Sequence, residues 1–356
     1  MTRSDVAQVG QPATTLPSRA VPRASTRPRP DSGFGGLVAA QALDGIGTAR
    51  FVGWTEVRAW RPGSGELWAH LDRKGPQSQH WLEQESGLED VVISALLADD
   101  TRPSVIPLSH GLLINLRGVN LNPGAEPEDM VWVQMWLEVG RVITSRHRHV
   151  AAVEDVRHTL ADPNLRGPRN AGDVVVRLAD KLLDRLGPVI EELEDQMADI
   201  DQRSAAGDHK QTRVELRDVR RRTMRLRRWV GPQRDVIARL AADQSPLFDE
   251  GQRLRLRSET DRVTRYVEDL DDLHERASAV HDVISQQLSE DMNRTMYLLS
   301  VVAAIVLPLA LLTELVSLDL PGIPGTELNG VLYVALLISI AAALTILFWR
   351  TRGRSL

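Results

Sequence analysis

The chain has 356 residues, a formal net charge of −5 and no cysteine. The lack of cysteine excludes a disulfide framework, a thiolate metal site and a cysteine nucleophile. The mildly acidic balance gives no reason to expect nucleic acid as a partner. The chain also lacks a Gly-Lys pair, which excludes a Walker A phosphate loop.

Residues 1–34 are predicted to form a disordered tail. Arginines and prolines lie there among serines and threonines, without an apolar period. Such a composition cannot bury enough apolar surface to offset the entropy of folding. A weak contact of the arginines with anionic lipid is the alternative to a solvated tail.

Residues 35–170 are predicted to form a mixed α/β unit, because short apolar runs alternate with Gly, Pro and Asp. Helical patterns cover residues 81–98 and 150–161. Strand patterns cover residues 50–60, 66–72, 111–117 and 131–137, and a hairpin turn at 138–141 leads into a strand at 142–145. The unit holds six of the eight tryptophans, most of which we expect in the core.

Residues 171–250 are predicted to form a helical hairpin. An acidic stretch with one apolar stripe, at 174–201, precedes a basic stretch at 212–243. This order predicts an antiparallel pair joined by ion pairs. Glu215 and Asp218 interrupt the arginines and no aromatic platform lies beside them, which argues against RNA.

Residues 251–316 are predicted to form a stalk helix that continues into a membrane span. No Gly or Pro occurs from Gln252 to Leu307, and a helix of about 60 residues is roughly 90 Å long. Its apolar residues alternate at spacings of three and four, as in a coiled coil. They are Val263, Val267, Leu270, Ala277, Val280, Ile284 and Leu288. Either the stalk packs on its own domain, or several stalks form a ring around a pore.

Two apolar runs, at residues 296–316 and 331–349, each have about the length needed to cross a ~30 Å hydrocarbon core. The loop 317–330 between them has no Lys or Arg, whereas Arg294 precedes the first run and the tail 350–356 is basic. The positive-inside rule predicts a hairpin with both termini in the cytoplasm. The lipid bilayer is thus an expected partner.

Several residues near the first span could carry transport chemistry. Pro308 removes a helix hydrogen bond, Thr313 supplies a hydroxyl, and Glu314 is an ionisable group in an apolar run. Asp319 follows at the predicted outer mouth, and Asn293 at the cytoplasmic foot is a further pore-lining candidate. Alternatively, Glu314 reaches the interface and Asp319 is an ordinary turn residue. In a ring of chains, both would form rings of carboxylates that attract cations and raise one another's pKa.

This region resembles the pore helix and external loop of the CorA superfamily of divalent metal-ion transporters. The matching residues are 307–319, LPLALLTELVSLD, and 320–325, LPGIPG. The loop is most similar to the ZntB-type zinc transporters, at Gly322, Ile323, Pro324 and Gly325, with Glu327 following in this chain. The resemblance continues through the soluble part, at 101–105, 113–120, 143–146 and 231–240.

The resemblance implies a homopentamer in the inner membrane of a bacterium. Each chain would contribute a layered α/β/α cytoplasmic funnel domain, a stalk and two transmembrane helices, and the five first spans would line the pore. It implies transport of divalent cations, with the zinc branch taking Zn²⁺ inward with help from the proton gradient. It implies no tightly bound cofactor.

The predicted mouth departs from the family's Gly-x-Asn motif, because this chain has Ser317, Leu318 and Asp319 there. In the family, a neutral asparagine meets a cation that sheds water reluctantly. Asp319 would place up to five negative charges there, and Glu314 stands where relatives usually have a small residue. We expect altered affinity or pH dependence. A Mg²⁺, Co²⁺ or Ni²⁺ channel of the same architecture and a non-conducting membrane protein are the alternatives; no nucleophile constellation suggests an enzyme.

The stalk also contains possible metal ligands, for which the family suggests a regulatory role in the cytoplasm. The candidates are Glu268, Asp271, Asp272, His274 and His281. Most side chains on such a helix point to solvent. The two histidines are about 10 Å apart along a helix, too far for one chain to bind a metal with both.

Overall fold

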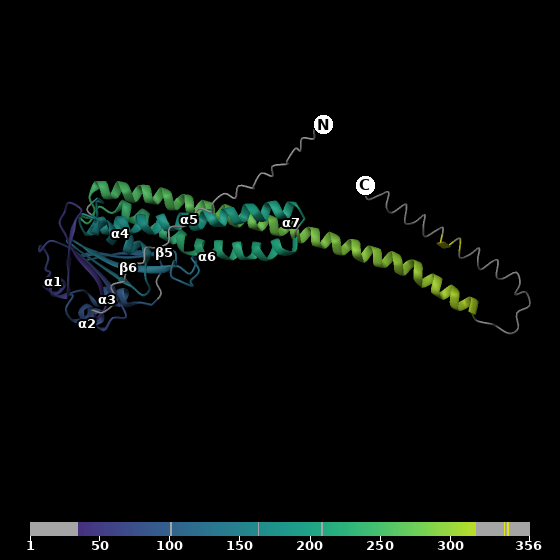
Figure 1. Cartoon of the computed structure of the whole chain (residues 1–356), viewed down its shortest axis with the longest axis horizontal. Coiled ribbons are helices and arrows are strands. Elements are labelled where there is room, and N and C mark those ends of the chain that lie inside the picture. The colour runs from purple at the N-terminus through teal and green to yellow at the C-terminus, as the bar shows by residue number, and fades with distance from the viewer. Residues whose placement is uncertain are drawn as a thin grey trace, which may run out of the picture.

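The computed structural model describes residues 35–99, 102–162, 164–207 and 209–317, with three further positions at 338, 340 and 341. The predicted tail 1–34, the loop from residue 318 to 330, nearly all of the second apolar run and the basic tail 350–356 lie outside the described residues. Figure 1 shows a body of sheet and helices from which one long helix extends.

In the described part of the chain, seven strands form one mixed sheet. Their spatial order is β2 (Ala49–Val52), β1 (Leu37–Leu43), β3 (Glu66–Asp72), β7 (Arg141–Arg146), β6 (Val131–Glu138), β5 (Gly111–Gly118) and β4 (Ser104–Leu108). Only β3 and β7 run parallel; the other neighbouring pairs are antiparallel. Every residue of β5 is buried, because helices cover both faces of the sheet there.

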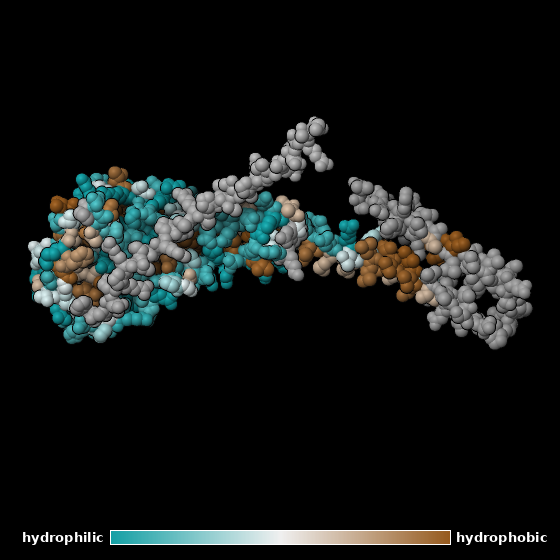
Figure 2. All heavy atoms as spheres, viewed as in Figure 1, coloured by the Kyte–Doolittle hydropathy of each residue, from teal (hydrophilic) through white to brown (hydrophobic). Residues whose placement is uncertain are grey.

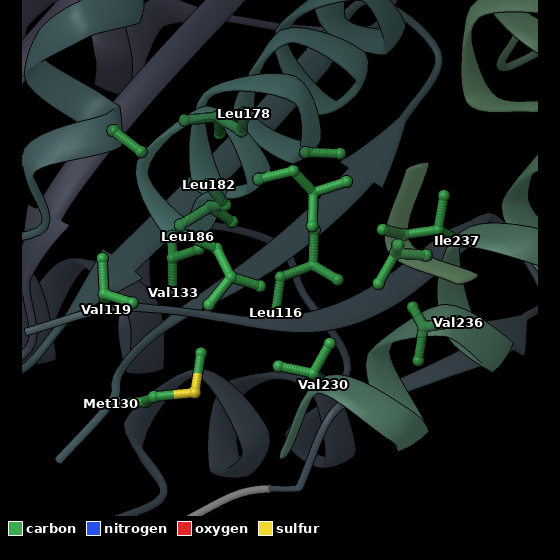
Figure 3. Packing of buried hydrophobic residues seen from close by; sticks show 14 of the residues in the cluster. Leu116, Val119, Met130, Val133, Leu178, Leu182, Leu186, Val230, Val236 and Ile237 are labelled. Atoms are coloured by element: carbon green, nitrogen blue, oxygen red, sulfur yellow. The ribbon is translucent and has the colours of Figure 1, made fainter. Parts of the chain in front are cut away.

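Alternate residues of each strand face opposite layers of helices, which confirms the predicted α/β/α layering of the soluble domain. One layer holds α1 (Trp54–Ala59), α2 (Pro76–Gln84) and α3 (Asp90–Leu97), and the other holds α4 (Ala151–Ala161) and α5 (Ala171–Ala205). Leu71 and Ile143 belong to the first core, whereas Trp68 and Val142 belong to the second. Figure 3 shows leucines of α5, Leu178 among them, packed against the second face of the sheet.

Three long helices make up the rest: α5, α6 (His209–Ala242) and α7 (Glu250–Ser317). Helix α5 begins where the Asn170 side chain accepts a hydrogen bond of 2.8 Å from the backbone N–H of Asp173, which satisfies one of the unpaired donors of the first turn. Helix α7 has 68 residues, about 100 Å of helix. It continues through Pro308, so the lost hydrogen bond does not end the helix.

Two parts of the α/β unit differ from the sequence prediction. Residues 50–60 are not one strand: β2 ends at Val52 and α1 begins after Gly53, whose backbone N–H donates to a Glu56 carboxylate oxygen at 3.1 Å. Residues 81–98 are two helices, because Gly87 between them has a φ of +70° that a helix cannot contain. The strands β1 and β4 were not predicted.

The apolar seam of α7 packs on its own domain along most of its length. Val263, Leu270 and Ile284 are buried in the same core as α5 and α6. Leu288, the last residue of the seam, is 46% exposed. The stalk therefore packs on its own domain as far as Ile284. The alternative interpretation, a ring of several stalks around a pore, stays a prediction.

Candidate ion pathway and its stalk

Beyond Ile284, α7 leaves the body and exposes apolar side chains. The exposed apolar residues there are Leu288, Met292, Met296, Tyr297, Leu298, Leu299, Val302, Ile305, Val306 and Leu307. Figure 2 shows a hydrophobic band on the outer part of the extended helix, with hydrophilic surface between this band and the body. The exposed polar residues Glu290, Asp291, Asn293 and Arg294 lie before the band begins. Among the residues that the structure describes, no helix has an apolar stretch long enough to cross a membrane.

The predicted pore residues lie at the end of this helix or past it. Asn293 is exposed, and Pro308 lies within α7. The backbone of Thr313, Glu314 and Ser317 is in the last two turns of α7. The predicted residues outside the described ranges are Leu318, Asp319, Gly322, Ile323, Pro324, Gly325 and Glu327. The helix thus carries the chain to the start of the predicted mouth without a break.

The stalk residues predicted to bind metal are not gathered within one chain. Asp271 forms an ion pair with Arg227 of α6. Two guanidinium nitrogens of Arg227 lie 2.6 and 3.1 Å from the carboxylate oxygens of Asp271. Glu268 and Asp272 are exposed, and His274 is half-buried. Within the described ranges, no three His, Cys, Asp or Glu side chains are placed so that they could hold a metal ion. A metal there would need ligands from more than one chain.

The acidic run of the stalk, which holds the predicted Glu268 and Asp272, extends through Asp269 to Glu194 of α5, a residue that the sequence did not single out. Burial raises the pKa of the Asp269 carboxyl, and the carboxylates of Asp272 and Glu268 raise it further. Burial also raises the pKa of Glu194 on α5, with Asp269 the first of the carboxylates that add to the effect. The many acidic residues at 174–201 are the sequence feature that could have indicated an acidic group at this helix. This face of the stalk is therefore electronegative.

The predicted ion pairs between α5 and α6 are few. Arg222 of α6 lies 3.6 Å from Glu192 of α5, but most acids of α5 that form interhelical ion pairs bind arginines of α7. Arg262 of α7 is the centre of these contacts, with Asp184 at 2.6 Å and Asp180 at 2.9 Å. The arginines that bind acids of α5 from another helix therefore belong mainly to the stalk, which the sequence pattern did not indicate.

Replacing Arg262 with methionine should lower the free energy of unfolding by about 2 kcal/mol. The side chain is only 21% exposed, and its loss leaves Asp180, Asp184 and Glu259 without their shared cation; hydrogen bonds to charged groups contribute roughly 1.5–3 kcal/mol. Urea unfolding of the full chain in detergent measures the change. In the control Arg257→Met, whose exposed partner Glu250 is 3.5 Å away, the loss should stay below about 0.5 kcal/mol. Equal losses would contradict the assignment.

His70 is a fully buried histidine in the centre of the sheet. Its Nδ1 lies 2.8 Å from the Thr144 hydroxyl, and its Nε2 has no hydrogen-bond partner among the described residues. Burial holds the pKa of the imidazole well below its usual value, and the positive charges of Arg146 and Arg157 lower it further. The folded protein therefore keeps His70 neutral.

His70 should make the protein less stable as the pH falls below about 6.5, the pKa of an unfolded histidine. Below that pH the unfolded chain binds a proton that the folded chain does not, so stability falls by up to ~1.4 kcal/mol per pH unit until the folded pKa is reached. Unfolding measured between pH 7 and pH 5 checks this. His70→Gln should have a shallower slope over that range, and an unchanged slope would show that His70 is not the group responsible.

Comparisons with known proteins identify the family of this fold. The model of the family described as "CorA-like Mg2+ transporter protein" matches residues 64–352. The chain belongs to the CorA-like family. Its members are transporters and not enzymes, and the resemblance found in the pore helix and loop is thereby confirmed.

Individual relatives match along most of the chain. The divalent cation transporter CmaX of Pseudomonas aeruginosa is 36% identical over 88% of this chain and 95% of its own length. The zinc transport protein ZntB of Yersinia enterocolitica is 34% identical over 72% of this chain and 78% of its own length. The solved structure of full-length CmaX has a TM-score of 0.78 and 35% identity, covering 89% of this chain and 98% of that structure. This CorA-like chain therefore has a divalent-cation transporter's overall fold.

Proposed function

We propose that this CorA-like chain carries Zn²⁺ into a bacterium through a homopentameric pore in the cytoplasmic membrane, assisted by the proton gradient. The observation that carries the proposal is the hydrophobic band of α7 beyond the body, where exposed apolar residues run from Met296 to Leu307. Apolar surface of this extent marks a membrane or protein contact. A helix that leaves a soluble body and ends at the predicted mouth fits a stalk that becomes a pore helix.

The choice of zinc rests on the loop and on the relatives. The GIPG piece at residues 322–325 resembles the zinc branch, and ZntB proteins match at 31–34% identity. The acidic loop and basic flanks support a hairpin with both termini in the cytoplasm. In a pentamer, Glu314 and Asp319 would form two carboxylate rings on the cation's path, and protons would compete with Zn²⁺ for them.

Zinc flux into proteoliposomes tests the proposal. The purified full-length chain is reconstituted, and Zn²⁺ uptake is followed with a trapped fluorescent indicator, with and without an inward proton gradient. We expect uptake that increases with the gradient and returns to the basal rate when an ionophore collapses it. Liposomes without protein are the control. Zn²⁺ uptake that does not depend on the proton gradient would contradict proton assistance but would still support transport of Zn²⁺.

Transport of Mg²⁺, Co²⁺ or Ni²⁺ is the second candidate function. The description of the family model names Mg²⁺ as the transported ion. The name of the relative CmaX specifies divalent cations but no particular metal. The same proteoliposomes distinguish the two, because Mg²⁺ or Co²⁺ uptake without Zn²⁺ uptake would assign the chain to this class. Silence for every ion would favour a non-conducting membrane protein, for which the changed motif at Ser317–Asp319 is the supporting observation.

A further inference from the structure

Helix α6 carries a row of arginines whose charge is not matched by any ion pair among the residues that the structure describes. Arg213, Arg217 and Arg220, here called the arginine stripe, are exposed and follow one another at spacings of four and three, which places them on one face of the helix. None of the three forms an ion pair or a side-chain hydrogen bond with another residue in the described ranges. By contrast, Arg221 and Arg225 beside them bind aspartates at 2.5 and 3.2 Å.

Helix α7 carries a row of acids with the same spacing. Glu268, Asp272 and Glu275, here called the acidic stripe, are exposed and also follow at spacings of four and three. None of them has an ion-pair partner in the part of the chain that the structure describes. Their neighbours Asp271 and Arg276 are paired within the chain. The charged neighbours of the stripes therefore form ion pairs between the helices. The arginine stripe and the acidic stripe remain as two exposed rows of opposite charge.

Ion pairs place Arg217 and Arg220 of the arginine stripe and Asp272 and Glu275 of the acidic stripe in one segment of the bundle. Toward the body, Arg227 of α6 binds Asp271 of α7 at 2.6 Å. All three stripe arginines have lower residue numbers than Arg227, and two of the stripe acids, Asp272 and Glu275, have higher residue numbers than Asp271. Because α6 and α7 run antiparallel, lower numbers in α6 and higher numbers in α7 lead in the same direction along the bundle.

The other end of this segment is marked in the same way. Glu215 of α6 binds Arg203 of α5, and Asp201 of α5 binds Arg276 of α7 at 2.6 Å. The segment between the two levels therefore contains Arg217 and Arg220 on α6 together with Asp272 and Glu275 on α7. Arg213 and Glu268 lie beyond opposite ends of this segment. Within it, the two arginines and the two acids form no ion pair with each other in the described ranges.

We propose that the arginine stripe of one subunit binds the acidic stripe of the next subunit around the ring. The inference rests on the homo-oligomer of the proposed function and adds the surface by which its cytoplasmic parts meet. Closed rings are built from heterologous contacts, in which one patch meets a different patch on the neighbour. A rotation about an axis parallel to the stalks changes no height, so Arg217 and Arg220 of one subunit meet the segment that holds Asp272 and Glu275 of the next. Complementary charge also disfavours wrong registers, because like charges would then face each other.

Cysteine cross-linking tests the contact without background, because the chain has no cysteine of its own. Full-length Arg217→Cys and Glu275→Cys chains with different tags are co-expressed, and the membranes are treated with a short, flexible bis-maleimide. We expect a dimer band that carries both tags, and no such band from either variant alone. Because the band carries both tags, it can come only from a link between two chains.

A matched control uses the same helix and the same acidic partner. Asp235 lies on α6 about five turns from Arg217, roughly 27 Å further along a nearly identical face, and it is exposed. Asp235→Cys combined with Glu275→Cys should give no mixed dimer. A band as strong as that of the Arg217→Cys pair would mean that collisions and not docking produce the product, and would overturn the proposal.

Charge reversal supplies a second test with a rescue. Arg217→Glu with Arg220→Glu should reduce the oligomeric fraction at a given concentration at least tenfold, and adding Asp272→Arg with Glu275→Arg to the same chain should restore it. Light scattering of the full chain in detergent measures the mass. A reversal without effect, or a loss that the second reversal does not restore, would overturn the pairing.

The outcomes separate this inference from the proposed function. An oligomer of the expected mass that gives no cross-link would overturn the stripe contact and leave the ring intact. A monomer would overturn the ring, and the stripe contact with it. If EDTA abolishes the cross-link and Zn²⁺ restores it, divalent cations and not arginines hold the acidic stripe, which also overturns the inference. A cross-link that EDTA leaves unchanged supports it.

Discussion

Replacing Asp319 with asparagine should weaken the apparent affinity for Zn²⁺ in uptake by about tenfold and shift the pH dependence of uptake. In the proposed pentamer the change removes up to five negative charges from the mouth. Charge-assisted contacts to a carboxylate contribute about 1.5–3 kcal/mol each, and a tenfold change in affinity corresponds to ~1.4 kcal/mol. The remaining neutral ring would resemble the family's asparagine, which suits cations that keep their water.

Initial rates of Zn²⁺ and Mg²⁺ uptake at several pH values measure both effects. Glu327→Gln is the matched control, because it removes one negative charge from the same loop but lies beyond the predicted mouth. We expect it to change the apparent affinity less than twofold. If Asp319→Asn leaves uptake, metal preference and pH profile as in the native chain, Asp319 is an ordinary turn residue and the cation does not meet it.

Replacing Trp68 with alanine should lower the free energy of unfolding by about 3–5 kcal/mol, the usual cost of removing a large aromatic side chain from a core. Trp68 is fully buried in the core between the sheet and α5, and its indole N–H donates to the Thr144 hydroxyl at 3.0 Å. The total free energy of unfolding of a native domain is about 5–15 kcal/mol. The variant should therefore lose a large part of its stability.

Denaturant unfolding of the full chain in detergent, followed by near-ultraviolet circular dichroism, measures the change. Trp68→Phe keeps most of the apolar volume and loses the hydrogen bond, so it should cost less than half as much as the alanine variant. A loss below about 1 kcal/mol for Trp68→Ala would mean that the core closes around the vacated space. The packing argument for this face of the sheet would then be wrong.

Local chemistry determined the elements that the sequence alone could predict. The run without Gly or Pro from Gln252 to Leu307 predicts one long helix, and the structure has it as part of α7. The turn at Gly140 predicts the β6–β7 hairpin, which is present with Val142 opposite Leu137. The family resemblance of the loop also needs only residues close together in the chain. Such signals are strong because a few adjacent residues decide the backbone conformation.

Only the tertiary structure decided the contacts between distant segments. The parallel pairing of Leu67 with Arg141 brings β3 beside β7, and no local pattern specifies which strands become neighbours. Two of the three partners of Arg262, Asp180 and Asp184, are likewise on another helix, so its role in joining the helices could not be read from the charges next to it in the chain. The seam of α7 shows the same limit: its period predicts an apolar face, but its burial against α5 and α6 as far as Ile284 depends on where those helices lie. Periodicity determines that a face is apolar, and packing determines what covers it.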